Sequence, residues 1–177
     1  MKKKTLALVL ALTLLVAGVV GGTLAWLTDR TAEVKNTFTV GDINIGLTET
    51  TTDYKMVPGN TIAKDPTVTV KANSEACWLF VKVTKSENLD TFITYAIAEG
   101  WTALPGVDGV YYREVPASDA DQTFPVLAGN AVTVKNTVTK EMLTAKDFAN
   151  PTLTFKAYAV QKDNVASASD AWAKVNP

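Results

Sequence analysis

The sequence predicts an all-β domain, a jelly-roll-like sandwich of two sheets and about eight strands with short helical connections, preceded by an N-terminal signal-peptide helix. Beyond the leader, apolar and polar residues alternate with the period of a strand, and Thr and Val are abundant. Gly, Pro, Asn and Asp separate the alternating segments. The chain has 177 residues, of which 47% are hydrophobic and 20% charged, as expected for one globular domain.

The N-terminal segment has the plan of a secretory signal peptide. Basic residues at positions 2–4 precede an uncharged run over 5–20, and Gly21 and Gly22 then break the helix. The small residue Ala25 ends the segment, which predicts cleavage between Ala25 and Trp26, a signal peptide over 1–25 and a mature domain over 26–177. The alternative is a permanent anchor, because the uncharged stretch over 5–28 is long enough to span a bilayer.

The first strand segment of the mature chain covers 36–49. The apolar residues Phe38 and Val40 are at even positions, whereas Ile43, Ile45 and Leu47 are at odd positions, which in a regular strand would face the opposite side. A glycine β-bulge at positions 41–42 would keep both sets facing the core.

The next segment contains two prolines with positional meaning. Pro58 followed by Gly59 predicts a type II turn, because Pro fixes a negative φ and Gly accepts the positive one. Pro66 is predicted to be the first residue of a strand that contains Val68 and Val70. At the start of a strand, a proline does not remove a hydrogen bond from the centre of the ladder.

The segment 76–84 predicts a strand that is apolar on both faces. Leu79, Val81 and Val83 face the core, and Trp78 and Phe80 lie on the opposite face, so the strand lies between layers or beneath a partner.

The sole cysteine, Cys77, is in this strand and cannot form an internal disulfide. It is interpreted as an inert core thiol, with a reactive or cross-linking thiol as the alternative.

The remaining chain supplies the rest of the sandwich. Further strands are predicted over 91–98, 109–115, 130–139 and 152–161. Alternation is lost over 140–150, which suits a short helix or a turn, and the C-terminal tail suits one or two helical turns with Trp172 inward. There is no domain linker and no repeat of fixed period.

Charge and composition restrict the function classes. After Ala25 the chain has 14 basic and 18 acidic residues. This mildly acidic balance lacks the excess of basic residues that would attract nucleic acid or an anionic membrane surface. The membrane is therefore expected as a partner only through the leader before cleavage. Histidine is absent, which removes the commonest metal ligand and the usual general base. No cofactor and no catalytic residue are predicted.

Three groups of residues could have a binding or catalytic role, but each also fits an ordinary structural role. Asp119 and Asp121 could offer oxygen ligands to calcium, but they fit a solvated loop better. Lys64, Asp65 and Pro66 fit turn and strand-start roles rather than chemistry, because neighbouring strand residues point to opposite faces. A set of aromatic residues suits either a carbohydrate or partner surface or ordinary core and half-buried sheet: Trp78, Phe80, Trp101, Tyr111, Tyr112 and Phe124.

Several stretches together resemble one known family. The segments GGTLAWLTD, NTFTVGDINIGLTE, PGNTIAKDPTV, ACWLFVKV and FKAYAVQ are similar to those of the TasA/camelysin family of secreted Gram-positive proteins, whose leaders are processed by the SipW-type signal peptidase. The likeness extends through about residue 85 and returns over 155–161. The resemblance implies a jelly-roll fold, a SipW-type signal peptidase as a processing partner, and secretion to the extracellular matrix or cell surface.

The resemblance also implies a function. TasA-like members form biofilm-matrix fibres in which the stretch after the cleavage site is donated as a strand to the next subunit, so a homopolymer is expected. The implied donor strand consists of Trp26, Leu27, Thr28, Asp29, Arg30, Thr31, Ala32, Glu33 and Val34. Two alternatives are a camelysin-like cell-surface metalloprotease, which the lack of histidine opposes, and a monomeric cell-envelope binding module.

Overall fold

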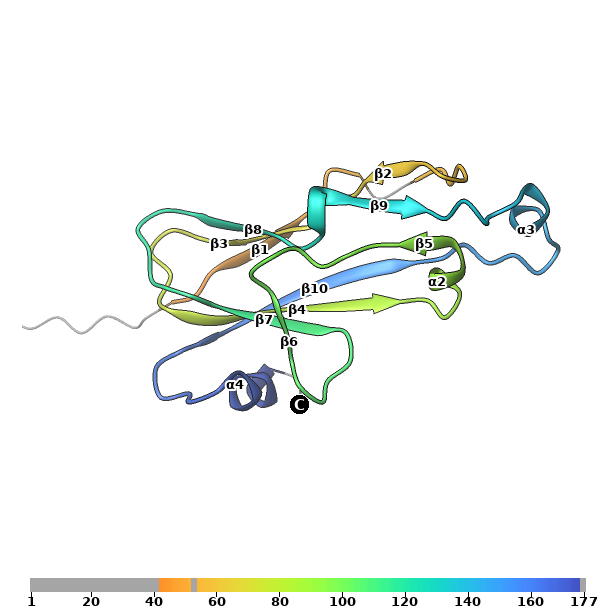
Figure 1. Ribbon diagram of the computed structural model, residues 1–177. Coiled ribbons are helices and arrows are strands. Elements are labelled where there is room, and N and C mark those ends of the chain that lie inside the picture. The colour runs from red at the N-terminus through yellow and green to blue at the C-terminus, as the bar shows by residue number, and fades with distance from the viewer. Residues whose placement is uncertain (1–41, 52–53, 176–177) are drawn as a thin grey trace, which may run out of the picture. The chain divides into compact units, whose positions relative to one another are not determined.

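The computed structural model describes residues 42–51 and 54–175, and these residues form mostly β-strands in three antiparallel sheets (Figure 1). The strands are β1 (Ile45–Thr48), β2 (Thr61–Ala63), β3 (Thr67–Val70), β4 (Cys77–Lys85), β5 (Ile93–Thr94), β6 (Thr102–Ala103), β7 (Val110–Val115), β8 (Gln122–Pro125), β9 (Ala131–Val134) and β10 (Leu153–Gln161). The helices are α2 (Leu89–Phe92), the 3-10 turn η1 (Ala128–Asn130), α3 (Lys140–Leu143) and α4 (Ala168–Val175). The predicted all-β class is confirmed. The predicted signal-peptide helix lies outside the described residues.

The largest sheet has the order β10-β4-β7-β6, and its central strand β4 is apolar on both faces. Leu79 and Val81 belong to one core cluster and are fully buried. Phe80, also fully buried, belongs to a second cluster on the opposite face together with Trp78. The predicted location of this strand between two layers is confirmed.

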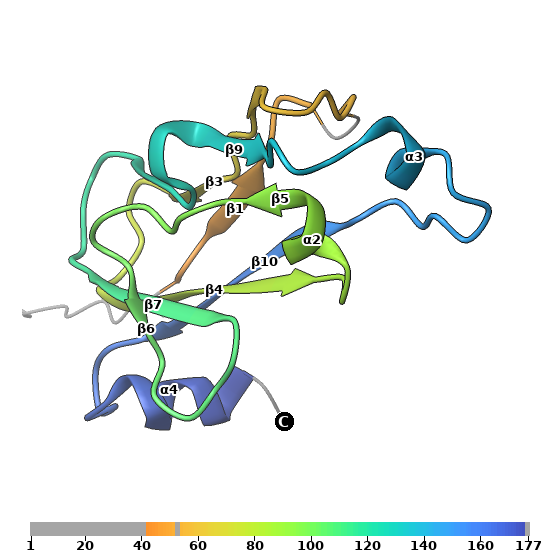
Figure 2. The same ribbon diagram turned by 45° about the vertical axis from the view of Figure 1, so that its right-hand side comes forward.

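Helix α4 covers one face of this sheet (Figure 2). Trp172 is 5% exposed, and its ring lies 5.3 Å from that of Phe80 and 5.1 Å from that of Tyr158, between centroids. Ser167 begins the helix, because its hydroxyl accepts a hydrogen bond from the Asp170 amide at 3.1 Å. The predicted helical tail with Trp172 inward is confirmed.

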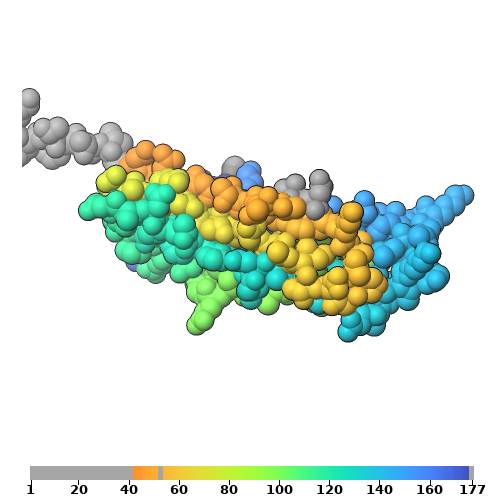
Figure 3. Space-filling view, turned by 90° about the horizontal axis from the view of Figure 1, so that it is seen from above, coloured from red at the N-terminus to blue at the C-terminus, as the bar shows by residue number. Residues whose placement is uncertain are grey.

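The other face of the large sheet is covered by two short sheets, β1-β3-β8 and β2-β9-β5. They are separated where Pro66 precedes β3 and where the segment from Val126 to Asn130 connects β8 to β9. Backbone hydrogen bonds cross this break, from Val126 N to Pro66 O at 2.9 Å and from Lys64 N to Asn130 O at 2.8 Å. Figure 3 shows from above the molecular surface over these residues, coloured from orange to teal. The sequence predicted two sheets, and this interruption of one covering layer produces the third.

Two local predictions have different outcomes. The turn at Pro58 and Gly59 is confirmed, since Gly59 has a φ of 79° and the Asn60 amide donates to Val57 O at 3.0 Å. The strand predicted over 91–98 is wrong at both ends, because α2 includes 91–92 and β5 covers only Ile93–Thr94, after which only an isolated bridge at Ile97 follows. Leu89 and Phe92 are both buried, and their spacing of three residues places them on one helical face.

Candidate functional site

Strand β10 forms one edge of the large sheet. Its nine residues pair in full register with β4, from Leu153 opposite Lys85 to Gln161 opposite Cys77. Within 42–51 and 54–175 it pairs with no second strand, although β1 lies close to it in the facing layer. In an antiparallel strand, alternate backbone groups point away from the partner, so part of this edge has N–H and C=O groups available to another strand.

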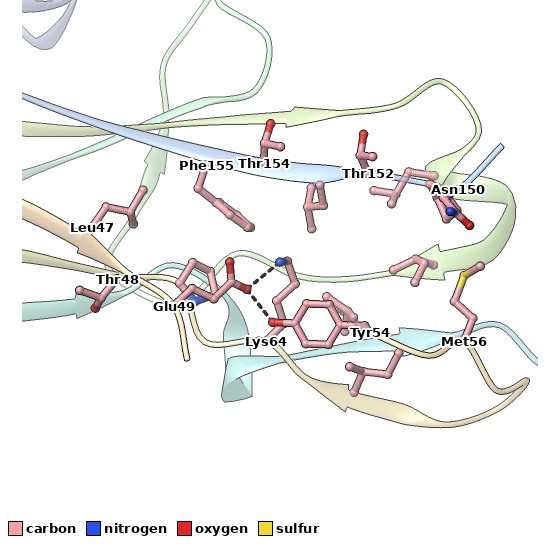
Figure 4. A pocket seen from close by; sticks show the side chains of 17 residues that line it. Leu47, Thr48, Glu49, Tyr54, Met56, Lys64, Asn150, Thr152, Thr154 and Phe155 are labelled. Carbon is pink, nitrogen blue, oxygen red and sulfur yellow. Dashed lines mark hydrogen bonds and ion pairs between the residues drawn. The ribbon is translucent and has the colours of Figure 1, made fainter. Parts of the chain in front are cut away.

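A pocket of about 640 Å³ lies beside the first residues of β10, and we call it the β10 slot (Figure 4). It is bounded by the end of β1, the segment before β2, the β2–β3 connection and β5. The side chain of Phe155 points into it, whereas Thr152 and Thr154 point to the other side of β10. Much of its lining is apolar: Leu47, Met56, Ile62, Ile93, Leu153 and Phe155.

One polar cluster lies within the β10 slot. Lys64 is 7% exposed, and its ammonium group lies 2.6 Å from Glu49 Oε1. The Tyr54 hydroxyl donates to the same oxygen at 2.9 Å. Burial and the neighbouring Glu49 carboxylate raise the pKa of Tyr54 above its ordinary value. The Lys64 ammonium also lies 4.9 Å from the Tyr54 ring centroid and 5.4 Å from that of Phe155.

Asp65 points to the other side of the same connection. Its carboxylate accepts hydrogen bonds from the Thr50 amide, at 2.9 Å, and from the Thr50 hydroxyl. These bonds hold the pKa of Asp65 below its usual range. The bonds of Glu49 with Lys64 and of Thr50 with Asp65 therefore connect the end of β1 to the residues that precede β3.

Residues 64–66 lie directly before β3, as predicted, but the burial of Lys64 was not predicted. A signal was present in the sequence, because Ile62, Lys64, Pro66, Val68 and Val70 share one parity. From Lys64 to Val70 every member of this set is buried. A lysine on the inward parity of a strand requires a buried partner, and Glu49 is that partner.

The sequence-predicted cleavage residues and donor strand lie outside the described residues. These are Ala25 and Trp26 at the expected cleavage position, and Leu27, Thr28, Asp29, Arg30, Thr31, Ala32, Glu33 and Val34 in the expected donor.

In the candidate calcium pair, Asp121 is bonded to protein groups. Asp121 accepts from the Ala72 amide at 2.8 Å and lies 2.9 Å from the Lys71 ammonium. The hydrogen bond from Lys71 lowers the pKa of Asp121. Asp119 is exposed in the preceding turn. Over 42–51 and 54–175, no group of three acidic or cysteine side chains is arranged to hold a metal ion.

The aromatic set belongs to the core and to half-buried sheet, as the plainer interpretation predicted. Trp78, Phe80 and Trp101 are buried, while Tyr111, Tyr112 and Phe124 are half-buried. Cys77 is fully buried, and burial raises its pKa to about 11. This environment fits the inert core thiol that the sequence favoured.

Comparison of the chain with protein-family models, with curated proteins and with solved structures gives no match. In the described part of the chain, no helix has the length and apolarity needed to cross a membrane.

Proposed function

We propose that this chain is a secreted, non-catalytic structural protein that self-assembles by strand addition into fibres of the extracellular matrix or cell surface. The domain is proposed to be a jelly-roll variant whose leader is removed after Ala25. The observation that carries the proposal is the nine-residue β10, which ends the large sheet beside an apolar slot. Edges of this kind are where strand addition occurs in protein assembly.

The occupant we propose is the segment from Trp26 to Val34 of a second copy. Sixteen residues, 26–41, separate the expected cleavage position from the first described residue. A nine-residue donor matches the nine residues of β10, and in extended form it spans about 30 Å. Trp26 and Leu27 are suited to the apolar lining of the β10 slot, where burial of each side chain would contribute about 2–3 kcal/mol.

The proposal is tested by cross-linking two single-cysteine variants that each begin at Trp26 and contain Cys77→Ala. One variant contains Leu27→Cys in the donor and the other contains Leu153→Cys in the slot. We expect the mixture to form a disulfide-linked heterodimer under mild oxidation, because strand addition would bring the two positions close together. Mixing separate variants restricts the heterodimer to contacts between molecules.

The matched control replaces Leu153→Cys by Ala103→Cys. Ala103 is exposed on β6, the opposite edge of the same sheet. Equal cross-linking at both edges, or none at Leu153, would contradict the proposed acceptor. As a second readout, deletion of 26–34 is expected to leave a folded monomer that forms no fibres in negative-stain electron microscopy. Fibres of unchanged length would refute strand donation by this segment.

A further inference from the structure

Arg113 on β7 forms a second candidate site, which is independent of strand addition. In the register of the large sheet, Arg113 lies opposite Leu79, so its side chain is on the face that packs towards β3 and β8. Its guanidinium carbon lies 4.1 Å from the ring centroid of Phe124 and 5.5 Å from that of Trp101. The cationic group is thus held against two aromatic rings from separate segments.

The walls of this site are fixed by the fold. Trp101 is 9% exposed, and its indole N–H donates to Pro125 O at 2.9 Å. Phe124 pairs with the fully buried Val68 across β8 and β3. Gly100 has a φ of 85°, and a Cβ there would lie 3.1 Å from Arg113 Nη2. A glycine at this position leaves space for the guanidinium, which is therefore pre-organised.

The charge of Arg113 has no counter-charge among the described residues. Within 42–51 and 54–175, four lysines form ion pairs with acidic side chains, namely Lys64, Lys71, Lys85 and Lys162, whereas Arg113 forms none. Its Nε is buried without a hydrogen-bond partner. Burial lowers the pKa of Arg113, yet a guanidinium in a protein remains protonated at neutral pH. A cation in this position lacks the anion that usually compensates for its burial.

We propose that Arg113 is a binding site for a carboxylate. Its two Nη groups donate two parallel hydrogen bonds to the two carboxylate oxygens. The Nη groups take this role because Nε is enclosed and unpartnered. A single guanidinium matches the single charge and planar shape of a carboxylate, whereas a phosphate dianion generally requires a second cation. The carboxylate is supplied either by an acidic side chain of a second copy or by a free organic acid.

The test uses the Arg Nε–H region of the ¹⁵N NMR spectrum of the chain that begins at Trp26. The sequence contains two arginines, Arg30 and Arg113, so this region contains two signals and Arg30 is an internal reference. Sodium acetate is titrated against sodium chloride at constant ionic strength. We expect a saturable shift of the Arg113 signal in acetate, no saturable shift in chloride, and no saturable shift of Arg30.

A dilution series without acetate distinguishes the two sources. If a second copy supplies the carboxylate, the Arg113 signal moves with protein concentration and acetate competes with that change. If the source is a free acid, the signal is independent of concentration. Arg113→Lys should abolish the saturable response of backbone amides near 100–101. Should the acetate titration be linear, or equal for both arginines, the site would be refuted, and this result does not depend on the variant being folded.

Discussion

Lys64 Nζ lies 2.6 Å from Glu49 Oε1, and the two side chains are only 9% and 17% exposed. The pair connects the end of β1 to the residue that follows β2, so it lies where the covering layer is interrupted. Because both charges are largely removed from water, each depends on the other for compensation.

Replacement of Glu49 by Gln is expected to destabilise the domain by about 2–4 kcal/mol, because it leaves the Lys64 ammonium buried without an anion. The double variant Glu49→Gln/Lys64→Met should recover part of this loss, since it removes both charges. Urea unfolding followed by tryptophan fluorescence measures the free energy of unfolding for each variant.

The matched control for this cycle is the exposed pair of Lys71 and Asp121, with side chains 52% and 47% exposed. Lys71→Met should change the free energy of unfolding by no more than about 1 kcal/mol. Equal effects at the two pairs would show that burial does not set the strength of the Lys64 pair.

A second prediction concerns the start of β7. Gly109 has a φ of 70°, its carbonyl accepts a hydrogen bond from the Val83 amide at 2.7 Å, and a Cβ at this position would overlap the Val83 carbonyl oxygen. Gly109→Ala therefore combines backbone strain with a clash against another backbone, and we expect a loss of about 2–4 kcal/mol. Thermal unfolding by circular dichroism provides the measurement.

Gly106 separates the two causes. Its φ of 75° is similar, but no atom lies within 4 Å of the position that a Cβ would take. Gly106→Ala should cost only the strain of the positive φ, about 1 kcal/mol. If both variants lose the same stability, the close approach to Val83 makes no contribution.

The strand pattern could be read from the sequence where burial repeats every second residue. β3 is the clearest example, because the buried Val68 and Val70 alternate with half-buried threonines. The Pro58–Gly59 turn was also predictable, since only a few residue types adopt its dihedral angles. The strands β6 and β8 were not predicted, because their residues, Thr-Ala and Gln-Thr-Phe-Pro, show no clear alternation of apolar and polar side chains.

The candidate site was less accessible to sequence reasoning than the fold. The partner of Lys64 is 15 residues away in the chain, and the walls of the Arg113 site come from β8 and the segment before β6. Such contacts depend on which strands face each other across the sandwich. Periodicity reports the face of a residue but not the element opposite it.

The buried thiol predicts a specific loss of stability at alkaline pH. Burial raises the pKa of Cys77 to about 11, from an ordinary value of 9.0. The folded state therefore retains a proton that the unfolded state releases. The resulting contribution is fully present below pH 9 and is lost as the pH rises towards 11, by up to about 2 kcal/mol.

Because lysines and tyrosines also titrate in this range, the measurement compares the native chain with Cys77→Ala. The difference in the free energy of unfolding between the two proteins should be constant from pH 7 to about 8.5 and should shrink between about pH 9 and 11. A difference that stays constant across the whole range would contradict a buried, neutral thiol. As a second readout, a thiol-specific reagent should modify Cys77 only at the rate of unfolding.

The last prediction tests how α4 is held to the large sheet. Trp172 contacts Phe80 of β4 and Tyr158 of β10, and Ala171 beside it is fully buried. Trp172→Ala removes the largest buried side chain of α4 and should cost about 3–5 kcal/mol. It should also increase hydrogen exchange at the amides of 168–175 more than at those of β4, because the helix loses its main contact before the sheet opens.

Lys174→Ala, an exposed position on the same helix, is the control and should leave both measurements nearly unchanged. If exchange rises equally in β4 and α4, the helix and the sheet unfold as one unit, and Trp172 supports the stability of the whole domain rather than the attachment of α4.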